Sequence, residues 1–274
     1  MAASKLPLRS ENAGLAFIGE SIWPPARLTG KQARQLAAAS DPTGRLNSDV
    51  IQRGLSLKSG HPSEHWQIDF PLHGTEAEAN LYAAPSRHLK SAQPTATGKW
   101  WRNPHAKIEL RTSLARLERS LVTPLAATEL TWTWIDSEVL PDANFLVVAR
   151  DDDFTHGLLN SPLFQIWWQH SGSLAPVDRI ASFPFPWPPR TLLSALTRPQ
   201  EEQRLALARA ARSGDLAQLS AAANAAYGWP LTSPPPLSAS ASSTKLTPTR
   251  ALVCNILYYK RAVTALRLFA GKFP

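Results

Sequence analysis

FLVVARDDDFTHGLLNSPLFQIWWQH, residues 145–170, contains both kinds of element from which we expect the fold to be built. Residues 145–149 are apolar and rich in Val and Phe, which predicts a buried strand. The three aspartates 151–153 are well placed to cap a helix that runs from about Thr155 to His170, since acids stabilise the first turn of a helix. We favour this capping role over a metal site, because a divalent ion needs oxygen ligands that converge from several elements.

Upstream of this stretch, the sequence predicts a helix over residues 106–121 and a strand over 131–135. Pro141-Asp142 is interpreted as a hairpin turn between the strands 131–135 and 145–149. It is not read as the start of a nuclease motif, because the required acid-x-Lys does not follow it. The helix rests on leucines that recur at spacings of four, three and four and so form one apolar stripe: Leu110, Leu114, Leu117 and Leu121.

The remaining elements are short and of both kinds, so we expect an α+β fold: a mixed domain of short strands and helices, followed by a small helical segment. The stretch 182–190 is too rich in proline for a helix and is expected to be extended. Further strands are expected over 15–18 and 66–70, and further helices over 31–39 with Thr29 as N-cap, over 200–212, and over 216–226 after Gly214-Asp215.

The composition indicates a chain with a substantial core, since 43% of the 274 residues are hydrophobic and ten are Trp. The single cysteine, Cys254, has no second thiol for a disulfide or a zinc site, so a reducing, cytoplasmic compartment fits best. Residues 1–9 contain no apolar signal-peptide core, and no stretch approaches 18 uninterrupted apolar residues. We therefore expect neither a secretory signal nor a membrane span.

The net charge of +8 is a weak argument for nucleic acid, because most of it lies in a low-complexity basic tail, residues 231–274. This tail has six cations and no acid, which leaves a net charge of +2 for residues 1–230. A DNA-binding face in the main body must therefore come from local clustering. The six tail cations are Lys245, Arg250, Lys260, Arg261, Arg267 and Lys272.

An ordered series of short motifs between residues 14 and 230 resembles the target-recognition and C-terminal helical region of MmeI-like, type IIG-like restriction–modification adenine DNA methyltransferases. The order of the motifs carries the resemblance, since none of them is specific alone. The motifs are Phe17-Ile18-Gly19, Trp66-Gln67-Ile68-Asp69-Phe70, Trp100-Trp101, Leu110-Arg111, Val122-Thr123-Pro124, Val139-Leu140-Pro141-Asp142, Ala149-Arg150-Asp151-Asp152-Asp153-Phe154, Gly157-Leu158-Leu159-Asn160-Ser161, Trp167, Phe183-Pro184-Phe185-Pro186-Trp187-Pro188-Pro189 and Ala225-Ala226-Tyr227-Gly228-Trp229-Pro230.

The resemblance implies an N-terminal extension (1–13), a target-recognition domain (14–190), a C-terminal helical segment (191–230) and the tail. Complete enzymes of this family bind S-adenosylmethionine in a Rossmann-like domain and methylate a flipped adenine. This sequence has no Gly-rich cofactor loop, and its Asn103-Pro104 is followed by His105 rather than by Pro-Tyr. We therefore expect the methyltransferase domain to be absent, and we expect no catalytic residue, cofactor site or metal site in this chain.

The chain also departs from the family pattern. After Val122-Thr123-Pro124 relatives have basic residues, whereas this chain has a neutral run that ends in the acid Glu129. Beyond Pro230 relatives continue into a Leu-rich helix, whereas this chain changes to Pro, Ser and Ala. If the basic residues touch phosphate in relatives, this chain has lost that contact.

One cluster of cations is the strongest functional signal in the main body. Six basic residues fall within 21 residues, offset only by Glu109 and Glu118, and we expect several on the exposed face of the helix 106–121. Such a face binds phosphates or places Arg against guanine, although an ordinary solvated helix face has the same composition. The candidate DNA-binding residues are Lys99, Arg102, Lys107, Arg111, Arg116 and Arg119.

Two pairs of adjacent tryptophans have either a structural or a DNA-binding role. Trp100-Trp101 and Trp167-Trp168 could stack on nucleobases, but burial in the core is the commoner role of Trp and is the one we favour.

For function, we expect a sequence-specific recognition module for double-stranded DNA that serves a methyltransferase domain supplied in trans. The alternative is a truncated, non-functional remnant of such a methyltransferase.

Overall fold

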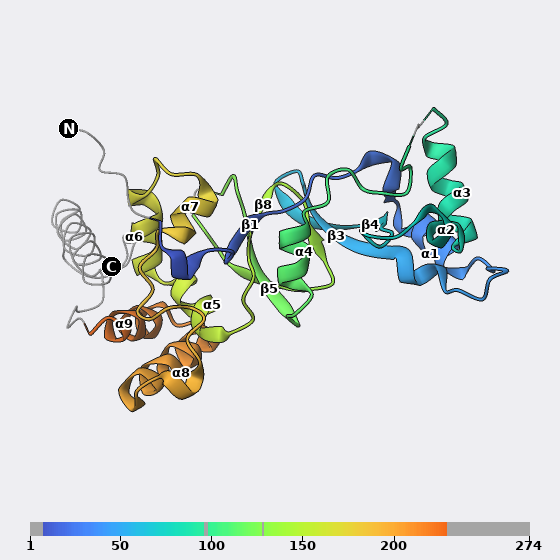
Figure 1. Ribbon diagram of the computed structural model, residues 1–274. Coiled ribbons are helices and arrows are strands. Elements are labelled where there is room, and N and C mark those ends of the chain that lie inside the picture. Colours follow the sequence, from blue (N-terminus) through green and yellow to red (C-terminus); the bar gives the residue numbers. More distant parts are fainter. Residues whose placement is uncertain (1–7, 96–97, 128, 229–274) are drawn as a thin grey trace. The chain divides into compact units, whose positions relative to one another are not determined.

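The computed structural model describes residues 8–95, 98–127 and 129–228, and it has the expected α+β composition (Figure 1). The chain divides into two compact units. The sheet unit consists of residues 16–127 and 134–149, and the helical unit consists of the described residues of 8–15, 129–133 and 150–228. Residues 14–190, expected to form one domain, contribute to both units. The expected tail lies outside the described residues.

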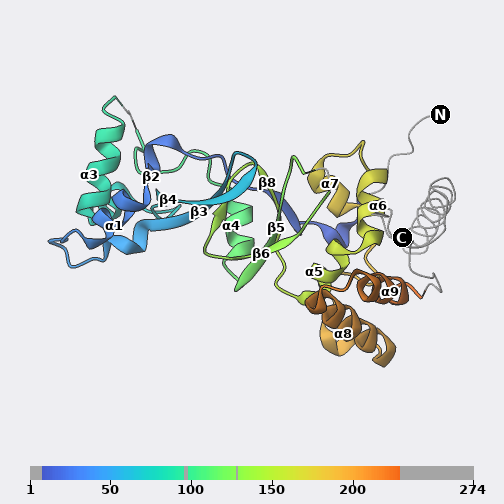
Figure 2. The same cartoon turned by 180° about the vertical axis from the view of Figure 1, so that it is seen from behind.

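The sheet unit contains two four-stranded sheets, ordered β1-β8-β5-β6 and β2-β4-β3-β7. In the first sheet β8 lies between β1 and β5 and is antiparallel to both, and Figure 2 shows β6 beside β5. In the second sheet the long strands β3 and β4 form an antiparallel hairpin. The strands are β1 (Ala16–Ile18), β2 (Arg27–Leu28), β3 (Ile51–Lys58), β4 (His61–Ile68), β5 (Arg119–Pro124), β6 (Thr133–Asp136), β7 (Leu140–Pro141) and β8 (Phe145–Val148).

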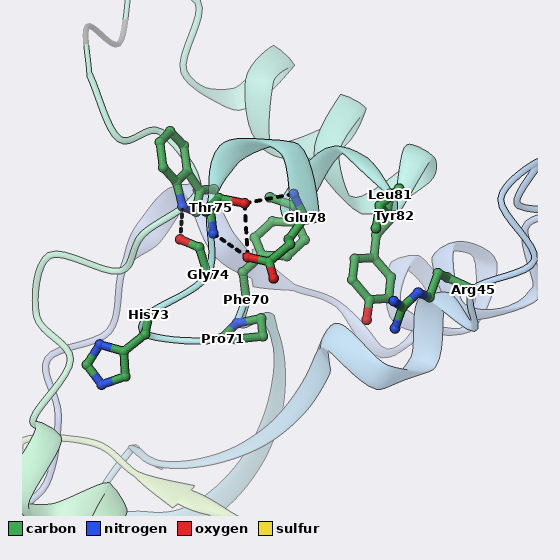
Figure 3. Close-up of a pocket in the computed structure, with 11 residues that line it drawn as sticks. Arg45, Phe70, Pro71, His73, Gly74, Thr75, Glu78, Leu81 and Tyr82 are labelled. Atoms are coloured by element: carbon green, nitrogen blue, oxygen red, sulfur yellow. Dashed lines mark hydrogen bonds between the residues drawn. The ribbon is translucent and has the colours of Figure 1, made fainter.

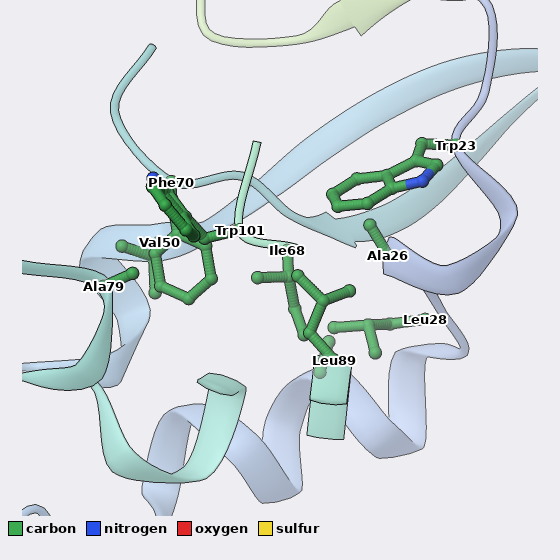
Figure 4. Packing of buried hydrophobic residues seen from close by; sticks show 10 residues of the cluster. Trp23, Ala26, Leu28, Val50, Ile68, Phe70, Ala79, Leu89 and Trp101 are labelled. Atoms are coloured by element: carbon green, nitrogen blue, oxygen red, sulfur yellow. The ribbon is translucent and has the colours of Figure 1, made fainter. Parts of the chain in front are cut away.

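Helices of the sheet unit cover the base of this hairpin. A buried cluster, the first core cluster, joins residues of β2 and β4 to side chains from the helices and loops around them, among them Trp23, Phe70 and Leu89 (Figure 4). Burial of such large apolar side chains contributes about 1.5–3 kcal/mol each. The helices of the unit are α1 (Gly30–Ala38), α2 (Glu76–Asn80), α3 (Ala83–Ala92) and α4 (Ile108–Leu114).

The β3–β4 hairpin reaches two cores. Its turn has positive φ at both Ser59 (52°) and Gly60 (80°), as a type I′ turn requires, and this turn matches the twist of long paired strands. At its base, Ile68 belongs to the first core cluster and Ile51 packs against that cluster. Nearer the tip, Leu55 belongs to the second core cluster, which also contains Leu110, Leu114, Val122, Val139, Phe145 and Val147.

The helical unit is built around aromatic side chains. Phe164 and Trp167 of α6 make edge contacts with Phe183, and Phe154 of α5 stacks on Trp187 at 4.8 Å. Phe183 and Trp187 lie in the proline-rich stretch 182–190, which is not helical, as expected, but contains turns and bends and is not extended throughout. The helices are α5 (Asp153–Asn160), α6 (Pro162–His170), α7 (Pro176–Ala181), α8 (Arg198–Ser213) and α9 (Leu216–Ala226).

The aspartate run caps a helix, as predicted from the sequence. Asp152 is the N-cap of α5: its side chain accepts a hydrogen bond from the backbone N–H of Thr155 at 2.7 Å and forms an ion pair with Arg150 at 2.7 Å. The cap satisfies an N–H that otherwise has no partner in the first turn of the helix.

Replacing Asp152 by alanine should lower the free energy of unfolding by about 1–2 kcal/mol, because the N-cap acceptor is lost. Chemical denaturation measures this change. Asp152→Asn is the matched control, since it keeps a capping oxygen and removes only the charge that pairs with Arg150. Equal losses in the two variants would assign the effect to the ion pair and not to the cap.

The predicted helix 106–121 is too long. The structure has a helix only over Ile108–Leu114, and Leu121 lies in β5, paired with Val148. The leucine spacing is helical, but Val122 and Thr123 are β-branched and fit a strand. Pairing with β8 therefore outweighs the local periodicity, and no continuous helix connects Lys107 to Arg119.

Two further predictions need correction. The expected helix 155–170 is divided at Ser161, which has ψ of 151° because it precedes Pro162, and a residue before proline avoids the helical region. The turn at Asp142 does not close a hairpin, because β5 lies between β6 and β8. Asp142 instead accepts a hydrogen bond from the backbone N–H of Asn144 at 2.9 Å and so stabilises the turn that leads into β8.

Candidate nucleic-acid interface

The six candidate cations do not share one helix face. Lys99 and Arg102 precede α4, and Lys107 is the residue at its N-cap. Arg111 is inside the helix, Arg116 follows it, and Arg119 begins β5. That these cations contact DNA stays a prediction. Their surroundings differ: the side chains of some contact other groups of the protein, and those of others do not.

Arg111 is the most enclosed of the six. Its Nε and Nη2 donate to the two carboxylate oxygens of Glu20 at 2.6 and 2.7 Å, and its Nη1 donates to Oδ2 of Asp69 at 2.6 Å. The side chains are 13% exposed for Arg111, 5% for Glu20 and 14% for Asp69. This cluster, the Arg111 cluster, joins α4 to the segments that follow β1 and β4.

The electrostatics of the Arg111 cluster favour a structural role. Burial raises the pKa of Asp69, and the charge of Arg111 offsets only part of that effect. Although burial opposes the charge on Arg111, its hydrogen bonds and charge interactions with Glu20 and Asp69 raise its pKa. Since the N–H donors of the Arg111 guanidinium already bind both carboxylates, we expect Arg111 to position α4 and not to contact a phosphate of DNA.

Three other candidates also contact protein groups. Nζ of Lys107 donates to the carbonyl oxygen of Ile18 at 2.9 Å. Nη2 of Arg102 donates to the carbonyl oxygen of Gly74 at 3.2 Å. The guanidinium of Arg119 lies 3.9 Å from the centre of the Trp134 ring, which is the distance of a cation–π interaction. Each of these cations would have to exchange its protein contact for a phosphate.

Lys99 and Arg116 are the two candidates that remain exposed. Within residues 8–95, 98–127 and 129–228, neither side chain forms an ion pair. Both can therefore approach a phosphate without breaking an existing contact.

A group of exposed cations at β2 and α1 was not predicted from the sequence. Arg27, Lys31 and Arg34 are exposed, and among the residues that the structure describes they form no ion pair. The stretch 21–40 contains these three cations and no carboxylate. That charge pattern, on a helix with a clear N-cap, could have pointed to this site from the sequence alone.

The Trp100-Trp101 pair is mainly structural. Trp101 is 9% exposed and its Nε1 donates to the carbonyl oxygen of Gly74 at 3.0 Å. Trp100 is partly buried against the first core cluster, and its Nε1 donates to Glu76 at 2.8 Å. The second pair is also buried, at 1% for Trp167 and 8% for Trp168. Both pairs therefore fit the favoured prediction, packing in the core, better than stacking on bases.

A pocket of about 340 Å³ lies beside Trp101 (Figure 3). Its wall includes the aromatic rings of Phe70 and Tyr82 and the polar side chains of Arg45 and His73. The hydrogen bond from the backbone N–H of Thr75 to Glu78 at 2.6 Å commits the carboxylate of Glu78 to a capping box, so this acid serves α2.

No protein-family model and no curated protein matches this chain. A solved structure to which the chain is similar is that of the type IIL restriction-modification enzyme MmeI in complex with DNA. The two have 13% sequence identity and a TM-score of 0.48. The match covers 95% of this chain and 36% of that one, so this chain spans about a third of the length of the enzyme.

Among the residues that the structure describes, no three His, Cys, Asp or Glu side chains come together as a metal site. In the same residues, no helix combines the length and apolar character needed to cross a bilayer.

Proposed function

We propose that this chain is a DNA-recognition module that binds duplex DNA through the sheet unit. The module would serve an adenine DNA methyltransferase whose cofactor-binding and catalytic groups belong to another domain or chain, and it would act in the cytoplasm. The resemblance of its ordered motifs to the target-recognition region of such enzymes suggests this role, and the charge distribution supports it.

One observation carries the proposal: residues 21–106 of the sheet unit contain an excess of cations, and most of these cations are exposed without an ion-pair partner among the described residues. Residues 21–106 contain ten Lys and Arg but six Asp and Glu. The helical unit has no such excess of cations. Its described residues, within 8–15, 129–133 and 150–228, include eight Arg and nine Asp or Glu. Eight cations of residues 21–106 are exposed and, among the described residues, form no ion pair: Arg27, Lys31, Arg34, Arg45, Lys58, Arg87, Lys90 and Lys99.

Phosphate is the ligand that such a surface fits best. Exposed cations without an internal partner can neutralise phosphates and release the counterions of DNA, so the affinity falls as salt rises. The buried carboxylates of the Arg111 cluster do not oppose this, because Arg111 neutralises part of their charge and they are withdrawn from the surface. A purely structural partner of a methyltransferase would not need these exposed cations.

Purified full-length chain should bind duplex DNA with an affinity that decreases linearly on a plot of log K against log salt concentration. Each phosphate contact contributes about 0.9 to the slope. Replacing Lys99 and Arg116 by alanine should lower the slope by up to about 2 and weaken binding to all sequences alike. Fluorescence anisotropy with a labelled duplex at several salt concentrations measures both.

Arg209→Ala is the matched control, because Arg209 is an exposed cation of the helical unit. It should leave the slope unchanged. Absence of salt-sensitive binding to any duplex by the wild-type chain would reject the recognition function and would agree with the remnant alternative. A methyl group transferred from labelled S-adenosylmethionine by this chain alone would reject the division of labour that we propose.

A further inference from the structure

The helix α1 has two chemically distinct faces. Gln32 and Ala33 lie on the inner face, where Ala33 is 3% exposed and Leu36 packs against the first core cluster. The outer face consists of residues at positions i, i+3, i+4 and i+7, which share one side of a helix. These outer-face residues, all exposed, are Lys31, Arg34, Gln35 and Ala38.

The inner face and the N-terminus fix α1 in place. Thr29 accepts a hydrogen bond from the backbone N–H of Gln32 at 3.3 Å, and the Gln32 side chain accepts one from the backbone N–H of Thr29 at 2.8 Å. This capping box satisfies two N–H groups of the first turn. The outer face takes no part in these contacts, so its side chains are not needed to hold the helix.

The outer face carries side chains of the types that read base edges in protein–DNA complexes. Arginine and lysine donate to the acceptors of guanine, glutamine pairs with adenine, and alanine contacts the methyl group of thymine. No carboxylate lies on α1. Nη1 of Arg34 lies 3.6 Å from the point where a Cβ on Gly30 would stand, so the guanidinium extends along the helix towards its N-terminus.

We propose that α1 enters the major groove of duplex DNA and that Arg34 and Gln35 contact base edges there. Lys31 and the neighbouring Arg27 contact flanking phosphates. The major groove is about 12 Å wide and accommodates a helix. The exposed side chains of Ala37 and Ala38 are small, which lets the helix backbone approach closely. The inference rests on the proposed DNA-binding function and assigns the base readout to one element.

The test selects bound sequences from a random duplex pool with full-length chains. The wild type should enrich one sequence, and the double variant Arg34→Ala/Gln35→Ala should lose preference at one to three adjacent base pairs. Its affinity for the enriched sequence should fall about ten- to a hundred-fold. Lys31→Ala should weaken binding to all sequences equally and lower the salt slope by about 0.9.

Arg87→Ala is the matched control, because Arg87 is an exposed cation of α3 and the substitution removes the same charge. As one of the exposed cations of the sheet unit, Arg87 can contribute only to the affinity for all sequences alike, so its loss should leave the enriched sequence unchanged. Circular dichroism and thermal unfolding verify that every variant is folded, as expected for substitutions at exposed positions.

The outcomes separate the two proposals. If the wild type binds no duplex, the DNA-binding function fails and this inference fails with it. If the wild type binds DNA but the double variant keeps the same sequence preference, or if Arg87→Ala alters that preference equally, only the role of α1 is overturned. Equal binding of an RNA duplex in competition would also overturn it, since side chains cannot read the narrow major groove of A-form RNA.

Discussion

Replacing Arg111 by methionine should lower the free energy of unfolding by about 3–5 kcal/mol. The substitution leaves the carboxylates of Glu20 and Asp69 buried without their cation, and an uncompensated buried charge is one of the costliest defects in a protein. Methionine keeps the length and apolar volume of the side chain, so the loss comes from the charge and its hydrogen bonds. Denaturation in urea measures the change.

The pH dependence of this loss identifies its cause. Without Arg111, burial should raise the folded-state pKa of Asp69 further, so the folded state takes up a proton that the unfolded state does not hold. The variant should therefore recover part of its stability as the pH falls from neutral towards about 4, the pKa of an aspartate in an unfolded chain. Arg116→Met, at an exposed position, should change stability by less than about 0.5 kcal/mol. A loss in Arg111→Met that is independent of pH would contradict the electrostatic explanation.

Gly19→Ala should destabilise the fold by about 3 kcal/mol or more. A Cβ at residue 19 would overlap the backbone carbonyl oxygens of Pro141 and Asp142. The backbone N–H groups of Gly19 and Glu20 donate to the carbonyl oxygens of Phe145 and Pro141 at 3.0 and 2.9 Å, so the two segments cannot separate without losing these bonds. Overpacking against a fixed backbone costs more than overpacking against a side chain that can move.

Gly30→Ala is the control for this second prediction. The nearest atom to a Cβ at residue 30 is 3.6 Å away, which is an ordinary contact, and alanine is the better helix former. This substitution should be neutral or stabilise the chain by up to about 1 kcal/mol. Thermal and urea denaturation should therefore show a large loss of stability for Gly19→Ala and no loss for Gly30→Ala, and similar losses in both would contradict the steric argument.

Elements with strong local signals could be predicted from the sequence. Thr29 begins α1, Asp152 caps α5, and Gly214, with φ of 70°, ends α8 before Asp215 caps α9. In each case a short-range hydrogen bond or a positive φ sets the boundary, so nearby residues contain the information.

Other elements could not be predicted, because their conformation depends on contacts with residues far away in the sequence. The leucine spacing around residue 114 fits a longer helix, and only pairing with β8 shows that residues 119–124 form a strand. The strand β3 was not anticipated, because its Gly54 has no local reason to be in a strand. A Cβ at this position would overlap the ring of His65 on β4, so the glycine is explained by its neighbour.

The candidate site was predicted only in part. Arg111 was expected among the DNA-binding cations, but its side chain is only 13% exposed, and its partners Glu20 and Asp69 are 91 and 42 residues away in the sequence. Long-range ion pairs of this kind cannot be found from the spacing of charges in one segment. The cations of α1 lie in a stretch without carboxylates, which is a pattern that the sequence shows. The cluster in residues 99–119 contains more cations, and the prediction was therefore based on that cluster.

The β3–β4 hairpin has a consequence for cooperativity. One pair of strands contributes Ile68, with Ile51 packed against it, to one apolar cluster and Leu55 to the other, within a ladder that runs without interruption from Ile51–Ile68 to Lys58–His61. Neither cluster can open far without distorting strands that the other cluster holds. We therefore expect the two clusters to open together, as one cooperative unit of unfolding.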